Sequence, residues 1–252
     1  MTKSYKIEAG DTLSTIAAKH GISLEAIRAA NPGINPTKLQ IGQIINLPDG
    51  HQPGNQHPLQ PNGSIPGSTG GSNGGGGYVN YSGPASNFPH QHEWASFEAL
   101  WKQNSALMKL HDSDSEIADT KSSIETVARQ SGVDVRAILC IIVQESGGNV
   151  RVGSTNNGIQ NPGIMQSHAG VSFNPANPAG NILQMVKDGT EGTKSGDGLK
   201  QCLERYGNYY ECFRAYNSGS VNKNDLNDPV GATGSYVRDA ANRLMGHQWP
   251  GM

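Results

Sequence analysis

An uncharged, glycine-rich stretch divides this chain and limits what it can fold into. Between residues 50 and 92 the sequence contains no Asp, Glu, Lys or Arg, and Gly, Pro, Ser, Asn, Gln and His dominate. Such a segment cannot bury enough apolar surface to offset the entropy lost when it is ordered. We therefore expect a flexible, disordered linker over residues 50–91, with a root-mean-square reach of about 35 Å. It separates a small segment, 1–49, from a larger one, 92–252.

The charge balance excludes two classes of partner. The 252 residues carry a formal net charge of −2 and have a pI near 6.4. This gives no electrostatic basis for binding nucleic acid or an anionic membrane. No apolar run approaches the ~20 residues needed to span a bilayer. Neutral, polar polymers such as glycans are compatible with this balance, and no oligomerising seam is apparent, so we expect a monomer.

Hydrophobic alternation and capping residues predict a strand–helix–helix–strand unit before the linker. Residues 4–9 alternate enough to form a short strand. Asp11 can cap a helix that begins at Thr12, and a second helix should end before Pro32. Residues 43–47 predict the closing strand. The result is a small βααβ domain in fewer than 50 residues.

The same segment resembles a LysM module. The resemblance rests on residues 5–17 (YKIEAGDTLSTIA), 31–32 (NP) and 39–48 (LQIGQIINLP). LysM modules bind chains that contain N-acetylglucosamine, in chitin or peptidoglycan. The resemblance therefore implies a glycan-binding groove between two loops, formed by Gly10, Asp11, Thr12, Leu13, Asn31, Pro32, Gly33 and Ile34. For Asp11, a role confined to capping its helix is an equal alternative.

Apolar periodicity predicts helices throughout the segment that follows the linker. The helical stretches lie at about 97–107, 115–130, 134–146, 180–187, 198–206, 209–216 and 236–245. A small hairpin can form within 149–162, and no other strand pattern of comparable strength appears. We expect an all-helical domain over 92–252, a sensible size for one domain, which makes the whole chain mainly α.

Glu145 occupies a special position near the end of the predicted helix 134–146. That helix is apolar almost all round and should be central and buried. Glu145 follows Ile142, Ile141 and Ile138 by three, four and seven residues, so its carboxyl group shares a stripe with three isoleucines. Burial disfavours the charged form and raises the pKa, as a glycosidic general acid requires. On spacing alone, a partly exposed or ion-paired glutamate is the commoner case.

Three motifs around and after Glu145 favour catalysis. They are residues 144–148 (QESGG), 161–166 (NPGIMQ) and 214–219 (RAYNSG). In this order and spacing they resemble the motif series of soluble lytic transglycosylases and goose-type lysozymes, over roughly 117–246, with features of a fungal branch. The resemblance implies a lysozyme-like fold. It also implies a muramidase that cleaves the β-1,4 bond between N-acetylmuramic acid and N-acetylglucosamine in peptidoglycan.

The resemblance also implies roles for individual side chains. The residues that it places in the site are Glu145, Ser146, Met165, Gln166, Tyr216 and Asn217. Glu145 would be the acid, and Ser146 would orient it or the substrate. Met165 and Gln166 would line the sugar subsites, while Tyr216 and Asn217 would hold the glutamate and the N-acetylated sugar. Core packing is an alternative for Met165 and Tyr216, and local capping for Ser146. No metal or organic cofactor is implied.

A second carboxylate is missing where a hydrolase of this type would be expected to have one. An inverting hydrolase needs a base ~6.5–9.5 Å from the acid, and goose-type lysozymes are thought to take theirs from the loop after the catalytic helix. Here no Asp or Glu occurs between Glu145 and Asp188, and that loop offers only amides, hydroxyls and Arg151. A base could come from Asp188, Glu191, Asp197 or another acid. Without one, Glu145 alone would give 1,6-anhydro products, by the lytic transglycosylase route.

The three cysteines permit one disulfide within the chain. Cys202 and Cys212 lie ten residues apart in a predicted two-helix region, and we hypothesise a bridge between them. Cys140 lies in an apolar run and is expected to be a buried thiol. Three reduced thiols are the alternative.

Location and wider function follow from these assignments. The amino terminus has no apolar signal core, so the extracellular location expected of a wall-acting protein requires a leader already removed or unconventional export. His51, His57, His90 and His92 lack the spacing of metal ligands, and we expect no metal. The partners expected are peptidoglycan or chitin-type polymers of N-acetylglucosamine. A non-catalytic glycan-binding protein and a chitinase are the functional alternatives.

Overall fold

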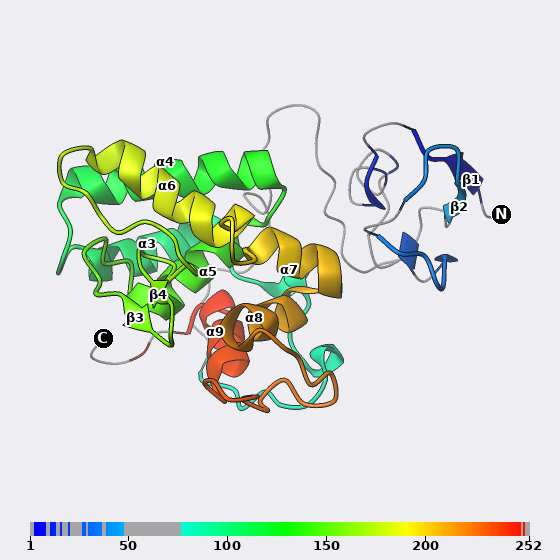
Figure 1. The fold of residues 1–252 in the computed structure, drawn as a ribbon. Coiled ribbons are helices and arrows are strands. Elements are labelled where there is room, and N and C mark those ends of the chain that lie inside the picture. The colour runs from blue at the N-terminus through cyan, green and yellow to red at the C-terminus, as the bar shows by residue number, and fades with distance from the viewer. Residues whose placement is uncertain are drawn as a thin grey trace. The chain divides into compact units, whose positions relative to one another are not determined.

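The computed structural model describes residues 3–8, 11–13, 16, 20, 27–28, 30–36, 39–47, 77–247 and 249. The chain forms two compact units, Met1–Ser64 and Ile65–Met252. Figure 1 shows a two-stranded sheet in the first unit and a mainly helical second unit. Within the described ranges, no helix combines the length and the apolar character needed to cross a membrane.

An antiparallel strand pair forms the sheet of the first unit. β1 (Lys3–Lys6) pairs with β2 (Ile44–Leu47), with Tyr5 opposite Ile45. Among the described residues of this unit, the buried apolar side chains are those of Ile7, Leu13, Ile16, Ile27, Ile45 and Leu47. Buried and exposed residues alternate along β2, the pattern of a strand with one face on the core. Both predicted strands are confirmed, and much of the two predicted helices lies outside the described residues.

Helices make up most of the second unit. In chain order, they are the 3-10 turns η1 (Ala85–Asn87) and η2 (Gln91–Glu93), then α3 (Phe97–Met108), α4 (Asp114–Ser131), α5 (Val135–Ser146), α6 (Pro178–Glu191), α7 (Leu199–Tyr206), α8 (Tyr209–Ser218) and α9 (Tyr236–Leu244). A short hairpin joins β3 (Thr155–Asn156) to β4 (Gln160–Asn161). The mainly α fold class is confirmed, and the hairpin lies where it was predicted.

The helix α5 is the buried centre of the second unit. Every residue from Val135 to Val143 is buried, as its all-round apolar sequence predicted. Asp134 caps the start of the helix, because its Oδ1 accepts a hydrogen bond from the N–H of Arg136 at 2.8 Å. The helices α3, α4 and α9 pack against α5, and α4 and α6 lie side by side (Figure 1). Glu145 is therefore carried by the last turn of a firmly held helix.

Two glycines end α5 directly after Glu145 and Ser146. The φ angles of Gly147 and Gly148 are 64° and 85°, a left-handed conformation that glycine adopts at little cost. A Cβ atom at Gly148 would also lie 2.6 Å from the side chain of Met108. The helix therefore stops immediately after the glutamate, and the chain turns away from the carboxyl group.

Residues 77–91, which the sequence analysis placed in the linker, belong to the second unit and pack against its helices. The backbone N–H of Val79 donates to Oδ1 of Asn242 at 2.7 Å, and its carbonyl accepts from Nδ2 at 2.8 Å. Phe88 is buried against Tyr210, with ring centroids 4.9 Å apart. The predicted start of the second domain at residue 92 is therefore too late, because uncharged composition does not reveal such long-range contacts. Residues 50–76 lie outside the described ranges.

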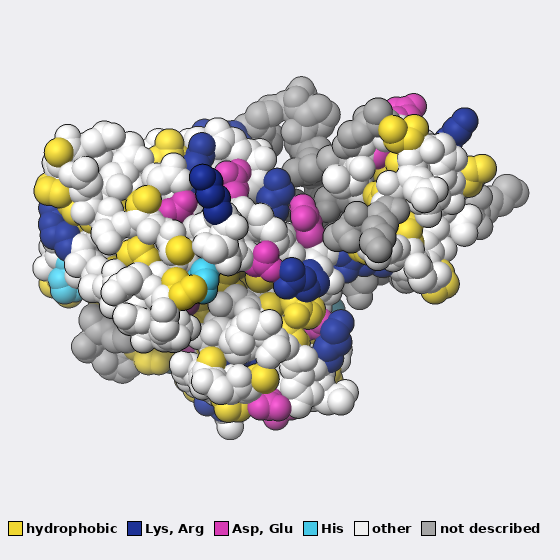
Figure 2. Space-filling model, viewed as in Figure 1, with side chains coloured by type: hydrophobic (Ala, Val, Ile, Leu, Met, Phe, Trp, Pro, Cys, Tyr) yellow, Lys and Arg dark blue, Asp and Glu magenta, His cyan; other side chains and the backbone are white. Residues whose placement is uncertain are grey.

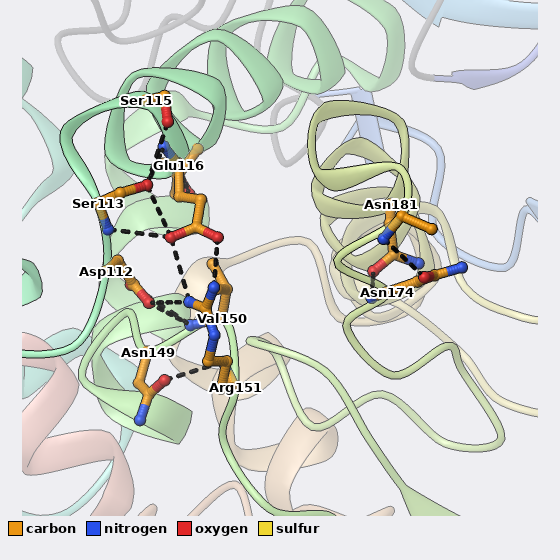
Figure 3. Close-up of polar contacts among 11 residues, drawn as sticks. Asp112, Ser113, Ser115, Glu116, Asn149, Val150, Arg151, Asn174 and Asn181 are labelled. Atoms are coloured by element: carbon orange, nitrogen blue, oxygen red, sulfur yellow. Dashed lines mark hydrogen bonds and ion pairs between the residues drawn. The ribbon is translucent and has the colours of Figure 1, made fainter.

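An ion-pair cluster fastens the loop after α5 to the start of α4 (Figure 3). Nη2 of Arg151 lies 2.6 Å from Oε1 of Glu116, and its Nη1 lies 3.5 Å from Oδ1 of Asp112. The N–H of Val150 donates to the same Asp112 oxygen at 3.2 Å. Hydrogen bonding to Arg151 lowers the pKa of the Glu116 carboxyl to about 2, whereas burial raises the pKa of Asp112. We call this cluster of Asp112, Glu116 and Arg151 the Arg151 clasp.

Candidate active site

A polar cavity of about 490 Å³ opens beside the end of α5. The side chains and backbone that line it are those of Glu145, Thr155, Asn157, Asn161, Gln166, His168, Ser195, Gly196, Asp197, Cys202, Arg205, Ala215, Tyr216, Asn217, Ser218, Gly219, Val230, Gly231 and Ala232. Polar, uncharged side chains are the largest class among these groups. On the face drawn in Figure 2, charged side chains are likewise scattered among uncharged atoms rather than gathered into one patch. Such a wall suits a neutral, hydrogen-bonding ligand.

Glu145 combines a raised pKa with a place in the cavity wall. Burial raises the pKa of its carboxyl group to about 7. The hydroxyl of Tyr236, on α9, donates a hydrogen bond to Oε1 of Glu145, which offsets part of this rise. Below about pH 7 the carboxyl group holds a proton that it can give to an oxygen atom in the cavity. This is the environment that the isoleucine stripe predicted.

The helix α8 carries two of the predicted residues into the same cavity. The Tyr216 hydroxyl donates to the carbonyl oxygen of Met165 at 2.8 Å. Burial, and then the nearby carboxylate of Glu145, raise the pKa of Tyr216 well above its ordinary value. The Asn217 Oδ1 accepts a hydrogen bond from the guanidinium of Arg214. The structure thus brings Tyr216 and Asn217 together with Glu145.

Gln166 joins the hairpin to the segment that follows it. Its Oε1 accepts from the N–H of Thr155 at 2.9 Å, and its Nε2 donates to the carbonyls of Gly163 at 3.0 Å and Gly153 at 3.2 Å. Its φ of 47° is uncommon for a residue other than glycine and is found in constrained segments of functional sites. Gln166 lines the cavity, and its amide holds the wall in place, while its predicted contact with sugar stays a prediction.

Ser146 and Met165 were predicted to contact substrate, but neither lines the cavity. The Ser146 hydroxyl lies within hydrogen-bonding distance of the Ile142 carbonyl (2.9 Å) and the Ile164 carbonyl (2.8 Å), so it fastens the end of α5 to the following segment. Met165 is fully buried, with its sulfur 3.9 Å from the hydroxyl of Thr190. Ser146 therefore has the local capping position, and Met165 the core position, that the sequence analysis gave as their alternatives.

Asp11 in the first unit braces a turn. Its Oδ2 accepts hydrogen bonds from the N–H of Glu8 at 2.7 Å and the hydroxyl of Tyr5 at 2.8 Å. The carbonyl of Thr12 accepts a helical hydrogen bond from Ile16 at 2.9 Å. The helix therefore starts one residue later than predicted, with Thr12 rather than Asp11 at its cap position. Gly10, the first residue of the predicted groove, lies outside the described residues.

The second loop of the predicted groove is tied to β2 by Asn31. Its Nδ2 donates to the carbonyl of Asn46 and its Oδ1 accepts from the Asn46 N–H, both at 2.7 Å. Pro32 and Gly33 are exposed, whereas Ile34 packs against the core and Leu13 lies within it. The exposed turn at Pro32 and Gly33 is thus held rigidly by its neighbours, and glycan binding there is a proposal.

The expected disulfide between Cys202 and Cys212 is not formed in this structure. Both residues are buried free thiols, and the thiol of Cys212 donates to the carbonyl of Leu199 at 3.3 Å. Burial raises the pKa of Cys212 well above its ordinary value, while a hydrogen bond from Cys212 lowers the pKa of Cys202. Cys202 and Cys212 therefore influence each other's ionisation without being bonded. Cys140 is a buried thiol, as predicted, and burial raises its pKa to about 12.

The histidines near the linker do not build a metal site in the part of the chain that the structure describes. There, no group of three or more His, Cys, Asp or Glu side chains is arranged to hold a metal ion. The rings of His90 and His92 stack on one another, with centroids 5.6 Å apart. His51 and His57 lie outside the described residues.

Sequence analysis did not identify the contact between Tyr236 and Glu145. The two residues are separated by 91 positions, and Tyr236 was predicted only as the start of a helix. No local pattern marks such a partner, because its position depends on how α9 packs against α5. The hairpin amides Asn157 and Asn161 were likewise missed as lining residues, although their loop was predicted.

Comparison with known families identifies both parts of the chain. Residues 5–48 match the LysM domain, and residues 122–236 match the transglycosylase SLT domain. The chain joins a LysM domain to a transglycosylase SLT domain. The lysozyme-like superfamily, inferred above from three motifs, is thereby confirmed. The SLT domain includes Glu145, Gln166, Tyr216 and Asn217, and it ends at Tyr236, the hydrogen-bond partner of Glu145.

Curated relatives share short stretches with this LysM–SLT chain. The putative sporulation-specific glycosylase YdhD of Bacillus subtilis is 52% identical over 44 residues, which are 18% of this chain and 10% of that protein. The teichoic acids export ATP-binding protein TagH of Lactococcus lactis is 48% identical over 46 residues, or 18% and 10%. The secreted LysM effector ELP2 of Colletotrichum higginsianum is 44% identical over 45 residues, or 18% and 26%. The chain thus spans only about a tenth to a quarter of these relatives.

A solved structure also matches. It is the crystal structure of a LysM domain from a Volvox carteri chitinase, and it is 46% identical to this chain. The match covers 19% of this chain and 98% of that one, with a TM-score of 0.19.

Proposed function

We propose that this chain cleaves the β-1,4 bond between N-acetylmuramic acid and N-acetylglucosamine in bacterial peptidoglycan. The observation that carries the proposal is the state of Glu145, a carboxyl group with a pKa raised to about 7 in the wall of a polar cavity. A carboxylic acid that is protonated near neutral pH can protonate a glycosidic oxygen. Its position within an SLT domain supports the choice of peptidoglycan as the polymer.

In the proposed reaction, Glu145 gives its proton to O4 of the N-acetylglucosamine unit as the bond between that oxygen and C1 of muramic acid breaks. Positive charge then develops at C1 and must be quenched by an oxygen nucleophile. Water gives a reducing end, which is the muramidase (lysozyme) outcome. The 6-hydroxyl of the same muramic acid gives a 1,6-anhydro ring, with Glu145 taking back the proton. The match to the transglycosylase SLT domain favours the second outcome.

The LysM domain is proposed to hold the enzyme on its polymer. Relatives with short matches include the N-acetylmuramoyl-L-alanine amidase XlyB of Bacillus subtilis and a chitin elicitor-binding protein of rice, at 46% and 40% identity. The first of these relatives is named as an N-acetylmuramoyl-L-alanine amidase, and the second is named as a protein that binds a chitin elicitor. We therefore propose binding of N-acetylglucosamine polymers by residues 5–48, and action on a cell wall outside the cell.

A substitution at Glu145 tests the catalytic proposal. The Glu145→Gln variant keeps the size and hydrogen-bonding capacity of the side chain but cannot transfer a proton. Release of soluble fragments from purified peptidoglycan, measured at pH 6, should fall by about 10²–10⁴-fold, while binding to the insoluble polymer is unchanged. Substantial turnover by this variant would refute the role of Glu145.

A non-catalytic glycan-binding protein is the second candidate, because the LysM domain needs no chemistry to bind. It requires that intact protein fails to clear a suspension of bacterial wall in a turbidity assay. A chitinase would instead release products from soluble chitin oligomers. Testing both substrates in parallel with the wild-type protein separates these outcomes from peptidoglycan cleavage.

A further inference from the structure

One exposed apolar side chain lies among the polar groups of the cavity wall. Val230 belongs to the loop between α8 and α9, drawn in orange in Figure 1, and it is 42% exposed. Among the large apolar side chains that are exposed in the described part of the chain, only Val230 lines the cavity. An exposed valine is common on protein surfaces and indicates nothing by itself. Its backbone conformation sets this one apart.

The backbone at Val230 has a conformation that disfavours valine. Its φ is 47°, and that of Gly231 is 89°. The N–H of Ala232 donates to the carbonyl of Pro229 at 2.8 Å, so Val230 and Gly231 are the central pair of a tight turn. A turn whose two central residues both have positive φ strongly prefers Asn followed by Gly. Gly231 follows this preference, whereas a β-branched residue before it is strained.

Polar contacts on both sides hold the turn in place. The N–H of Val230 donates to Oδ1 of Asp228 at 3.2 Å, and the other Asp228 oxygen accepts from Nδ2 of Asn222 at 2.9 Å. On the other side, the guanidinium of Arg214, which is fully buried, donates to the carbonyl of Thr233 at 2.9 Å. These contacts fix the backbone around Val230, so its side chain keeps its place in the cavity wall.

An N-acetylated glycan matches a wall of this kind. Its hydroxyl and amide groups can form hydrogen bonds with the polar lining, while the C–H face of each sugar ring and the acetyl methyl group are apolar. Contact between such a face and the exposed Val230 side chain removes apolar surface of both partners from water. Strain that persists beside a ligand cavity is typical of residues retained for binding rather than for stability.

We propose that Val230 is a substrate-binding residue that contacts the apolar face of an N-acetylated sugar in the cavity. This inference rests on the cleavage proposed above, because it takes the glycan as the ligand of the cavity. It explains why a β-branched side chain occupies a turn position that prefers asparagine.

The test replaces Val230 in the full-length chain. Val230→Asn introduces the residue that the turn prefers, so it relieves strain while it removes the apolar surface. Ala169→Asn is the matched control, because Ala169 also has a positive φ, of 52°, and is exposed outside the cavity wall. Val230→Leu keeps an apolar surface without a branch at Cβ. For each variant, KM and kcat are measured on soluble peptidoglycan glycan strands, and the midpoint of thermal unfolding is measured by circular dichroism.

The proposal expects Val230→Asn to affect stability and binding in opposite directions. Its thermal midpoint should be at least that of the wild type, because strain is relieved. Its KM should rise by about fivefold or more, with kcat within about twofold of the wild-type value, because the lost contact is made before and during the reaction alike. Ala169→Asn should also keep its midpoint but leave KM unchanged, and Val230→Leu should keep KM within about twofold of the wild type.

Three results would overturn the role of Val230 while leaving the proposed cleavage intact. The first is an unchanged KM in Val230→Asn, or a rise that Ala169→Asn shares. The second is a lower thermal midpoint in Val230→Asn, since Val230 would then stabilise the loop. The third is a KM for Val230→Leu that rises as far as that of Val230→Asn. Absence of any cleavage by the wild type would instead overturn the proposed function, and the inference with it.

Discussion

At the residue scale, two influences act in opposite directions on the carboxyl group of Glu145. Burial raises its pKa, and the hydrogen bond from Tyr236 lowers it, with burial the larger effect. The net value of about 7 leaves the group protonated in mildly acidic solution. If the protonated form is the active one, cleavage should fall as pH rises through about 7, because the proton needed for the leaving oxygen is lost.

The Tyr236→Phe variant tests this balance. Phenylalanine keeps the ring but removes the hydroxyl that stabilises the carboxylate, so the pKa of Glu145 should rise further. The alkaline limb of kcat/KM against pH should therefore move to higher pH, with the maximal rate reduced by less than about tenfold because the acid itself is retained. A profile measured from pH 4 to 9 on soluble glycan strands gives the answer. A limb that stays in place, or moves to lower pH, would contradict the assigned contact.

At the element scale, the sharp end of α5 depends on backbone conformation and close packing. Gly147 and Gly148 both have positive φ, but only Gly148 lacks space for a side chain, because a methyl group there would lie 2.6 Å from Met108. A methyl group at Gly147 would meet nothing within 4 Å. The two neighbouring glycines thus form a matched pair for separating backbone strain from steric crowding.

We expect Gly147→Ala to cost about 1 kcal/mol of unfolding free energy, from strain alone, and Gly148→Ala about 2–4 kcal/mol, from strain plus overpacking. Urea denaturation of both variants, followed by circular dichroism, measures the difference. Equal losses would show that the buried side chain of Met108 moves aside freely, and that crowding does not fix this helix end.

The Arg151 clasp should make stability depend on pH in a defined direction. The folded-state pKa of Glu116 is about 2, below its ordinary value of 4.5. Its contribution is therefore fully present above about pH 4.5 and is lost as pH falls toward 2. Asp112 acts in the opposite sense, because burial raises its pKa. Arg151 lies 2.6 Å from Glu116 but 3.5 Å from Asp112. We therefore expect the effect of Glu116 on stability to be the larger one.

Arg151→Met keeps a long side chain but removes the guanidinium, whose carbon lies 4.7 Å from the centroid of the Phe173 ring, and so leaves the buried carboxylates without their partner. We expect the free energy of unfolding at pH 7 to fall below that of the wild type, with a smaller decrease at pH 3. Arg129→Met, at an exposed position on α4, is the control and should change stability by under about 0.5 kcal/mol. Urea denaturation at both pH values measures the effect, and a loss that is larger at pH 3 than at pH 7 would contradict it.

Local chemistry explains which elements could be predicted from sequence. The helix containing Glu145 is marked by an apolar run, an aspartate cap and a glycine pair, and all three act within a few residues. The packing of residues 77–91 and the contact of Tyr236 with Glu145 could not be predicted in this way, and the spacing of Cys202 and Cys212 could not decide between a bridge and free thiols. Each of these features depends on segments that are distant in the sequence and meet only in the folded protein, so residue spacing does not predict them.

At the scale of the whole molecule, two separate hydrophobic clusters correspond to two tasks. The cluster around Ile16 and Ile45 belongs to the first unit, and the cluster around α5 belongs to the second. Every residue that lines the cavity lies in the second unit. If residues 5–48 only hold the enzyme on insoluble polymer, their effect should appear as a raised local concentration of substrate rather than as a change in the chemical step.

Deleting residues 1–49 should therefore separate the two tasks. On soluble glycan strands, kcat/KM should stay within about twofold of the full chain, because the cavity and its supporting core are intact. On insoluble peptidoglycan, the rate at low enzyme concentration should fall by about tenfold or more, since binding through the cavity alone must replace two-site attachment. Pelleting assays with the same substrate measure the lost attachment directly. Equal losses on both substrates would instead mean that the LysM domain supports the catalytic unit itself, and no loss on either would remove the case for wall binding by this domain.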